Sequence, residues 1–154
     1  MFDCIELDGL HHGPNWAEAT AEELQARVQD ALDDEAGWVV DGNYHAKLST
    51  LLWDRADLIV WLDLPFSTKL KRLTWRTVRR VLTREVLWNG NRESLKGAFW
   101  GRDSLFAWTI RMHFRHRGEW PQQLSGRHVV RLETPKEVAQ WLAAFARDAP
   151  PPSD

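Results

Sequence analysis

Two short apolar segments that end in a carboxylate and a turn carry the strongest chemical signal in this chain. GWVVDGNY covers Gly37–Tyr44 and has Asp41 before a glycine, and DLIVWLDLP covers Asp57–Pro65 and ends on Asp-Leu-Pro. Buried parallel strands have this composition. Because open α/β sheets bind ligands beyond the carboxyl ends of their strands, a carboxylate at this place is a candidate ligand-binding group. The nine glycines nowhere form the phosphate loop G-x-x-x-x-G-K-[ST].

A second signal is a run of cations on a helix predicted over about Thr68–Trp88. At about 100° per residue, six cations fall within an arc of roughly 140°: Lys69, Arg72, Arg76, Arg79, Arg80 and Arg84. The opposite side is predicted to pack on the sheet through Leu70, Trp75, Val78, Val81 and Leu82, although Leu73 breaks the separation. Arginine suits bidentate phosphate contacts. Two interpretations of this cationic face remain open. It binds an anion, or it is a solvated surface that pairs with acidic residues elsewhere in the chain.

Charge is unevenly distributed behind a net charge of −2. Residues 1–64 carry 14 acidic and 3 basic side chains, whereas residues 69–117 carry 13 basic and 3 acidic ones. The basic middle segment predicts an anionic partner, either a phosphorylated small molecule or nucleic acid. No apolar run approaches the roughly 18 residues that span a bilayer. The single cysteine excludes an internal disulfide, so we expect a cytoplasmic protein with no membrane partner.

The elements that must position these residues alternate between strands and helices. Strands are predicted over Phe2–Gly9, Trp38–Asp41, Leu58–Leu64 and His128–Leu132. Helices are predicted after the Thr20/Glu23 and Thr134/Glu137 capping boxes, near Ala46–Trp53, and over Ser104–Arg117 with Asp103 as its cap. The glycine-rich and asparagine-rich segment Asn89–Arg102 is interpreted as an irregular lid. This alternation predicts a layered α/β fold with a parallel sheet.

Several segments together resemble a known family. They are IELDGLHHGPNW at Ile5–Trp16, WVVDGNY at Trp38–Tyr44, ADLIVWLDLP at Ala56–Pro65, LWNGNRE at Leu87–Glu93 and the closing HVVRLETPKEVAQWL. In this order they resemble the P-loop kinase-like proteins related to adenylate kinase, which are also labelled adenylate kinase-like or DNA topology modulation (FlaR-like) proteins. The resemblance covers about Phe2 to Phe145.

The resemblance implies a three-layer P-loop NTPase-like fold of the nucleotide kinase type, with a parallel sheet and flanking helices. It implies a single domain over residues 1–147 with a lid at approximately 84–117, and we expect a disordered tail at 148–154. The family's strand order is like 2-3-1-4-5, and its first strand and phosphate loop are not in this sequence. We expect either that a start placed too late at Met1 omits roughly 25 residues, or that the segment is truly lost. In the second case the strands at 38–41 and 58–64 are expected to pair directly.

The resemblance also implies roles in phosphoryl transfer from ATP with Mg²⁺. Asp41 would hold Mg²⁺ directly or through water, and Asp8 would orient the acceptor hydroxyl or accept its proton. Four arginines would neutralise charge on the transferring phosphoryl group or bind substrate: Arg76, Arg80, Arg84 and Arg92. Asn43, Tyr44 and His12 would shape the acceptor pocket. For each of these candidate site residues, the alternative interpretation is a turn residue or a surface residue without a catalytic or binding role.

Three functions are therefore open. The first is an ATP-dependent kinase of a nucleotide or another small molecule, with weak or no activity in this chain because no phosphate loop is visible. The second is a nucleic-acid-binding module that uses the basic helix over residues 69–84 and nearby tryptophans. The third is a degenerate scaffold without catalysis. The pattern after Asp41 differs from that of true adenylate kinases, so AMP is not the expected acceptor.

Overall fold

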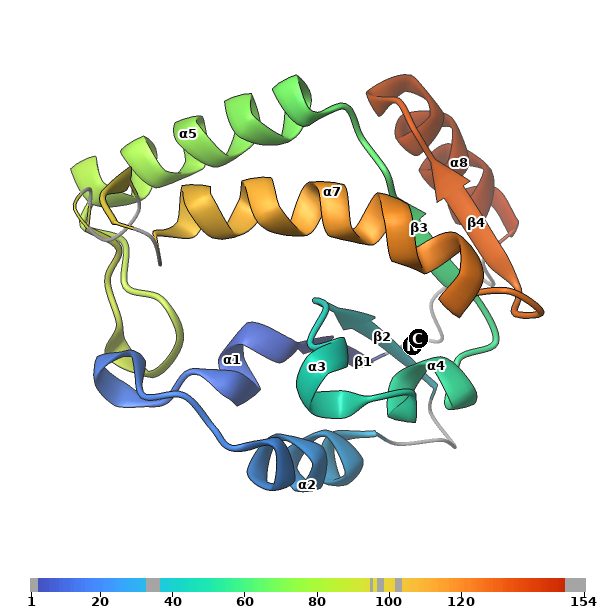
Figure 1. Ribbon diagram of the computed structural model, residues 1–154, viewed down its shortest axis with the longest axis horizontal. Helices are drawn as coiled ribbons and strands as arrows, with labels where there is room; N and C mark the ends of the chain where they lie inside the picture. The colour runs from blue at the N-terminus through green and yellow to red at the C-terminus, as the bar shows by residue number, and fades with distance from the viewer. Residues whose placement is uncertain (1–2, 33–36, 95, 97–98, 102–103, 149–154) are drawn as a thin grey trace. The chain divides into compact units, whose positions relative to one another are not determined.

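The computed structural model describes residues 3–32, 37–94, 96, 99–101 and 104–148 (Figure 1). The chain divides into two compact units. Unit 1 consists of Met1–Ala56 and Val86–Asn91, and unit 2 consists of Asp57–Glu85 and Arg92–Asp154. We expected one domain over residues 1–147. Each unit has its own two-stranded sheet, and we describe each by itself.

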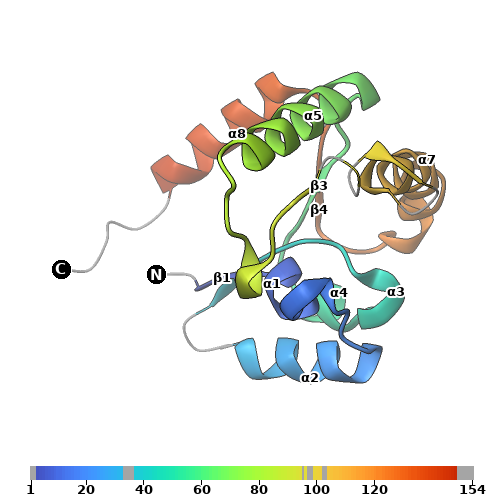
Figure 2. The same cartoon turned by 90° about the vertical axis from the view of Figure 1, so that its left-hand side faces the viewer.

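The described residues of unit 1 form two strands, one helix of 11 residues and several shorter helices. Its elements are β1 (Asp3–Glu6), α1 (Leu7–His11), η1 (Pro14–Trp16), α2 (Ala21–Ala31), β2 (Trp38–Asp41), α3 (His45–Leu48), α4 (Leu51–Arg55) and η2 (Trp88–Gly90). Figure 2 shows α2 along one side of this unit, next to α1 and α3, and both of these helices contact it. The first strand is shorter than predicted. The residues after Glu6 turn into a helix, so Asp8 lies in the first turn of α1.

The described residues of unit 2 form two strands and three long helices. Its elements are β3 (Ile59–Leu62), α5 (Phe66–Leu82), α7 (Leu105–Gln123), β4 (Val129–Leu132) and α8 (Pro135–Asp148). Figure 2 shows α7 on one side of the β3–β4 pair and α8 on the other. The helix predicted to end at Arg117 continues to Gln123. Among all the described helices, none is both long and apolar enough to cross a membrane.

Both sheets are parallel, as predicted, so the α/β class is confirmed. In the first sheet Asp3 pairs with Trp38 and Glu6 with Asp41, and in the second Ile59 pairs with Val129. The described strands form the orders β1-β2 and β3-β4 only. The direct pairing of residues 38–41 with 58–64 that we expected for a lost first strand is absent from these strands.

Local capping signals identified two helix starts correctly. The Thr20 side chain accepts a hydrogen bond from the Glu23 backbone, and the Glu23 carboxylate accepts one from the Thr20 backbone. Thr134 and Glu137 repeat this arrangement at α8. Such reciprocal bonds satisfy backbone N–H groups that a helix start otherwise leaves without partners. At α7 the cap is Ser104, which accepts from the Ala107 backbone, whereas the predicted cap Asp103 lies outside the described residues.

The core of unit 1 is built from side chains of β1, α1, α2 and α3 and of the residues next to α2. Its buried side chains are Ile5, Leu7, Ala19, Leu24, Val28, Leu32 and Leu48. Gly42 follows β2 with φ of +127°, and a Cβ atom there would lie 2.9 Å from the Leu7 Cβ atom. Glycine is required at this turn because a side chain would be strained by the backbone and would collide with Leu7.

Helix α5 is rotated relative to the prediction. Leu73, which seemed to break the pattern, is only 8% exposed, whereas Trp75 and Leu82 are 73% and 78% exposed. The helix also begins and ends earlier than predicted, at Phe66 and Leu82. Trp75 and Leu82 therefore do not pack on the sheet, and this part of the prediction is wrong.

The end of α5 is a Schellman motif without glycine. Arg84 adopts φ of +52°, its backbone N–H donates to the Val81 carbonyl at 3.3 Å, and the Glu85 N–H donates to the Arg80 carbonyl at 3.0 Å. This left-handed residue terminates the helix. Arg84 therefore lies outside the helical face on which we predicted it.

The rotation of α5 predicts unequal costs for two leucine truncations in the same helix. Leu73→Ala leaves a cavity and should lower the free energy of unfolding by about 2–4 kcal/mol. Leu82→Ala removes an exposed side chain and should change it by less than about 0.5 kcal/mol. Urea unfolding followed by circular dichroism measures both. Equal losses would contradict the rotation described here.

Candidate functional site

The carboxyl ends of β1 and β2 gather most of the residues predicted for the acceptor site. Asp8 Oδ1 accepts a hydrogen bond from the Tyr44 hydroxyl at 2.5 Å, and the same hydroxyl lies 3.5 Å from His12 Nε2. Among the described residues no donor bonds the second Asp8 oxygen. Burial and then the bond to Asp8 raise the pKa of Tyr44, so the phenol stays protonated and donates at neutral pH. Asp8, His12 and Tyr44, predicted separately, therefore form one cluster.

His11, which was not among the predicted site residues, joins this cluster. Its side chain is 3% exposed, and its ring centroid lies 4.6 Å from those of both His12 and Tyr44. Burial and the nearby Lys47 ammonium lower the pKa of His11, which is therefore neutral at pH 7. The Nδ1 atoms of His11 and His12 are buried and have no hydrogen-bond partner among the described residues. Buried polar atoms of this kind are uncommon and mark a place where a ligand or water could bind.

Glu18 and Lys47 hold the outer side of His11. The Lys47 ammonium donates to the Glu18 carboxylate at 3.1 Å and to the Ala19 carbonyl at 2.8 Å. His11 Nε2 lies 3.5 Å from both the Lys47 ammonium and a Glu18 oxygen. Hydrogen bonding to Lys47 lowers the pKa of Glu18. No sequence motif suggested these partners, which come together only when α3 packs on the loop after α1.

The loop that carries His12 is tied down by a distant segment. Asn91 is 4% exposed; its amide nitrogen donates to the Gly13 carbonyl at 2.9 Å, and its oxygen accepts from the Trp16 backbone N–H at 2.9 Å. Asn89 donates to the His12 carbonyl at 2.6 Å, and the Trp88 indole donates to the Glu6 carboxylate at 2.7 Å. Residues 88–91, which lie in the segment that we interpreted as a lid, thus hold the histidine loop.

Asp41 and Asn43 occupy the same strand edge in a more open setting. Asp41 is exposed at the end of β2, in register with Glu6. Asn43 accepts a hydrogen bond from the His45 backbone at 3.3 Å and so shapes the turn into α3. No three His, Cys, Asp or Glu side chains of the described residues are grouped as a protein-built metal site requires. Any cation held at Asp41 would therefore take most of its ligands from water or substrate.

The four predicted arginines belong to unit 2 and differ from one another. Arg80 is largely buried and pairs with Glu93 at 2.9 Å and with Glu85 at 3.4 Å. Arg76, Arg84 and Arg92 are exposed. Arg80 is therefore already neutralised by two carboxylates. The single cationic face that we predicted from Lys69 to Arg84 is wrong, because Arg84 leaves the helix and Arg80 turns inward.

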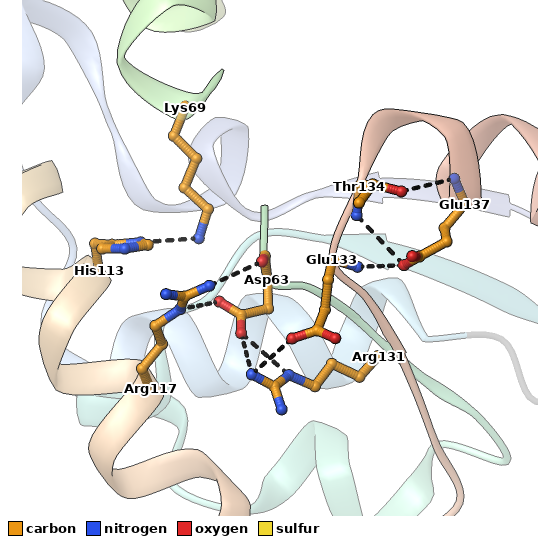
Figure 3. A network of polar contacts seen from close by, with 8 residues as sticks. All are labelled: Asp63, Lys69, His113, Arg117, Arg131, Glu133, Thr134 and Glu137. Carbon is orange, nitrogen blue, oxygen red and sulfur yellow. Dashed lines mark hydrogen bonds and ion pairs between the residues drawn. The ribbon is translucent and has the colours of Figure 1, made fainter. Parts of the chain in front are cut away.

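Unit 2 has a polar network of its own, centred on Asp63 (Figure 3). The Asp63 side chain is 1% exposed and follows β3 in the DLP turn. Arg117 Nε from α7 donates to Oδ1 at 2.7 Å, and Arg131 Nε from β4 donates to Oδ2 at 3.0 Å. The Arg131 guanidinium also lies 4.6 Å from the centre of the Trp61 ring. The carboxylate therefore joins β3, α7 and β4.

Charge states in this network follow from burial and from the two guanidinium groups. Burial alone would raise the pKa of Asp63, but hydrogen bonds from Arg117 and Arg131 outweigh it and hold the pKa below its usual value. Burial and the Lys69 ammonium lower the pKa of His113, whose Nδ1 lies 3.4 Å from that ammonium. Burial lowers the pKa of His116 to about 4, and its ring stacks on Trp120. Both histidines are thus neutral at pH 7.

Sequence reasoning missed this network as a unit. The DLP turn signalled a strand end, but the two arginine partners lie 54 and 68 residues away. The arrangement has the features of a structural ion pair, since both oxygens of the buried carboxylate are occupied. Comparison with known proteins gave no match to a family model, to a curated protein or to a solved structure.

Asn91→Ala should destabilise unit 1 by about 1–3 kcal/mol, because it removes two part-buried hydrogen bonds, one from the Trp16 N–H and one to the Gly13 carbonyl. Gln29→Ala, at an exposed amide on α2, should change stability by less than about 0.5 kcal/mol. Urea unfolding measures both. Amide hydrogen exchange supplies a local readout, because the Trp16 N–H should lose protection in Asn91→Ala only. Retained protection would contradict the role of Asn91.

Asp63→Asn should lower the free energy of unfolding at pH 7 by about 1–3 kcal/mol. The folded pKa of Asp63 lies below its unfolded value near 3.8, so its contribution is complete above that pH and disappears as the pH falls through the folded pKa. The difference between wild type and Asp63→Asn should therefore shrink below about pH 4. Glu119→Gln breaks an exposed pair with Arg115 and should cost less than about 1 kcal/mol. A difference that is constant from pH 7 to pH 3 would contradict this assignment.

Proposed function

We propose that this chain belongs to an ATP-dependent phosphotransferase with the fold of the P-loop kinases related to adenylate kinase, and that unit 1 binds the phosphoryl acceptor. The ordered motifs from Ile5 to the terminal helix support the family. The two parallel pairs support the fold, because β1-β2 and β3-β4 correspond to the neighbours 2-3 and 4-5 in the expected order 2-3-1-4-5. Helices on both sides of the β3–β4 pair agree with a three-layer arrangement.

The observation that carries the acceptor assignment is the geometry of Asp8. Tyr44 fixes one carboxylate oxygen at 2.5 Å, and the other oxygen has no described donor. A hydroxyl of the acceptor can donate to this second oxygen. As the acceptor oxygen forms a bond to the γ-phosphorus, its proton passes to Asp8, and the bond between the γ-phosphorus and the leaving oxygen of ADP breaks. Tyr44 acts by positioning Asp8, and His12 Nε2 lies 3.5 Å from the Tyr44 hydroxyl.

Asp41 is the residue that would hold Mg²⁺, directly or through water. A single exposed carboxylate suits this ion, which keeps several waters and takes other ligands from phosphate oxygens. When bound, Mg²⁺ would neutralise charge on the phosphates of ATP. Arg76, Arg84 and Arg92 are exposed cations that suit phosphate contacts, and Asn43 shapes the turn beside Asp41. The sequence contains no G-x-x-x-x-G-K-[ST] loop, so we expect ATP to bind weakly and turnover to be slow or absent.

Acceptor binding is testable in the chain itself by NMR, with nucleosides and nucleoside monophosphates as probes at millimolar concentration. At least one probe should shift amide signals of residues 8–16 and 43–47. Asp8→Asn should abolish these shifts. Asp3→Asn, which makes the same charge change at the other end of β1, should leave them unchanged. Tyr44→Phe should weaken binding about five- to ten-fold, as expected for one lost hydrogen bond.

Shifts that persist in Asp8→Asn would reject Asp8 as the acceptor-binding carboxylate. The absence of shifts with every probe would favour the scaffold interpretation over the kinase.

A further inference from the structure

The outward side of α5 is an exposed cationic surface in unit 2. It consists of residues within an arc of about 140° at 100° per residue: Lys71, Arg72, Trp75, Arg76, Arg79 and Leu82. All six are exposed. We call this surface the outer face of α5. It differs from the face predicted from sequence, because Lys69 and Arg80 are turned inward and Trp75 lies among the arginines.

Packing on the opposite side of the helix orients this face. Leu73 and Thr77 are buried there, and Leu70 and Val81 are half-buried beside them. The ring centroid of Phe66, in the first turn of α5, lies 5.3 Å from the ring centroid of His113 in α7. These contacts determine which side of α5 is exposed. The cations of the outer face therefore project from the same side of the helix.

The charges of the outer face are largely uncompensated. Lys71, Arg72 and Arg76 form no ion pair with any described residue. Arg79 is the exception, with a Glu85 oxygen 3.3 Å from its guanidinium. Like charges this close on one helix repel one another, and a bound polyanion relieves that repulsion.

Trp75 gives the surface a second property. Its indole is 73% exposed and contacts no aromatic ring among the described residues, yet it lies between Lys71, Arg72, Arg76 and Arg79 on the helix surface. Proteins that bind single-stranded nucleic acid combine cations that follow the backbone with exposed aromatic rings on which bases stack. Arginine is the favoured cation for this purpose because its planar fork contacts phosphate and also stacks on bases.

We propose that the outer face of α5 binds single-stranded nucleic acid, with Trp75 stacking on a base and the flanking cations contacting phosphates. From Lys71 to Arg79 the helix rises about 12 Å, a length that spans about three or four phosphates at the roughly 3.4 Å spacing of a stacked strand. A membrane surface fits less well. Helices that lie in lipid need a broad apolar face, and here Trp75 and Leu82 are the only large apolar members. This activity does not rest on the proposed phosphotransferase, whose acceptor residues are in unit 1.

The test is fluorescence anisotropy of a labelled oligothymidylate of about 20 nucleotides with the full chain over a range of NaCl concentrations. With up to four phosphate contacts, the slope of log K against log salt should be about −2 to −3, since each contact contributes about −0.7 for single strands. Arg72→Gln/Arg76→Gln should weaken binding at least ten-fold and reduce the slope by about 1.4. Arg115→Gln/Arg147→Gln removes two exposed cations from α7 and α8 and should leave the slope unchanged.

Substitutions of Trp75 test the contribution of base stacking separately from that of the cations. Trp75→Ala should weaken oligothymidylate binding about ten-fold with an unchanged salt slope, and Trp75→Phe should restore most of the affinity. Urea unfolding checks that the variants keep wild-type stability, as expected for exposed positions. Three results would overturn the proposal: no binding to the oligonucleotide, equal losses in the two double variants, or binding to phosphatidylserine vesicles that the oligonucleotide does not compete for.

Discussion

A buried carboxylate must be matched by cations, and in unit 2 this requirement organises the structure. Asp63 ends β3 with a side chain that is 1% exposed, and leaving it without partners would cost several kcal/mol. Arg117 from α7 and Arg131 from β4 meet this need from elements far apart in the sequence. Because both guanidinium groups are half exposed, they stay partly hydrated while they neutralise Asp63. One ion-paired centre thus holds both strands of the sheet and a helix together.

Unit 1 satisfies its buried polar groups differently. There the carboxylate of Asp8 is bonded to a neutral phenol, the ring of His11 packs against the Tyr44 ring, and His12 lies beside the phenol hydroxyl. Only part of this cluster is satisfied, because the Nδ1 atoms of His11 and His12 are buried without described partners. A fully paired network such as that of Asp63 mainly confers stability, whereas a partly paired one is costly unless something binds to it. This contrast is why the acceptor proposal rests on unit 1.

Predictions succeeded where the cause was local. The Thr20/Glu23 and Thr134/Glu137 boxes involve residues three apart, so their helix starts followed directly from the sequence. The strand Trp38–Asp41 was predicted with the observed bounds. The apolar run lies between Gly37 on one side and the Asp41-Gly42 turn on the other. The end of α5 was missed because the residue that terminates it in a left-handed conformation is Arg84, and a non-glycine residue gives no such signal.

The sequence by itself determined the alternation of strands and helices, the parallel class of the sheets and the placing of Asp8, Tyr44 and His12 near strand ends, since short-range periodicity and turn chemistry govern these features. Only the tertiary structure decided which side of α5 faces outward. Leu73 and Trp75 both fit an apolar stripe, and contact with the rest of unit 2 selects Leu73. The tertiary structure also chose the partners of Asp63 and the bonds from Asn91 to the histidine loop. These pairs lie 54 to 78 residues apart, a separation at which sequence spacing says nothing about proximity.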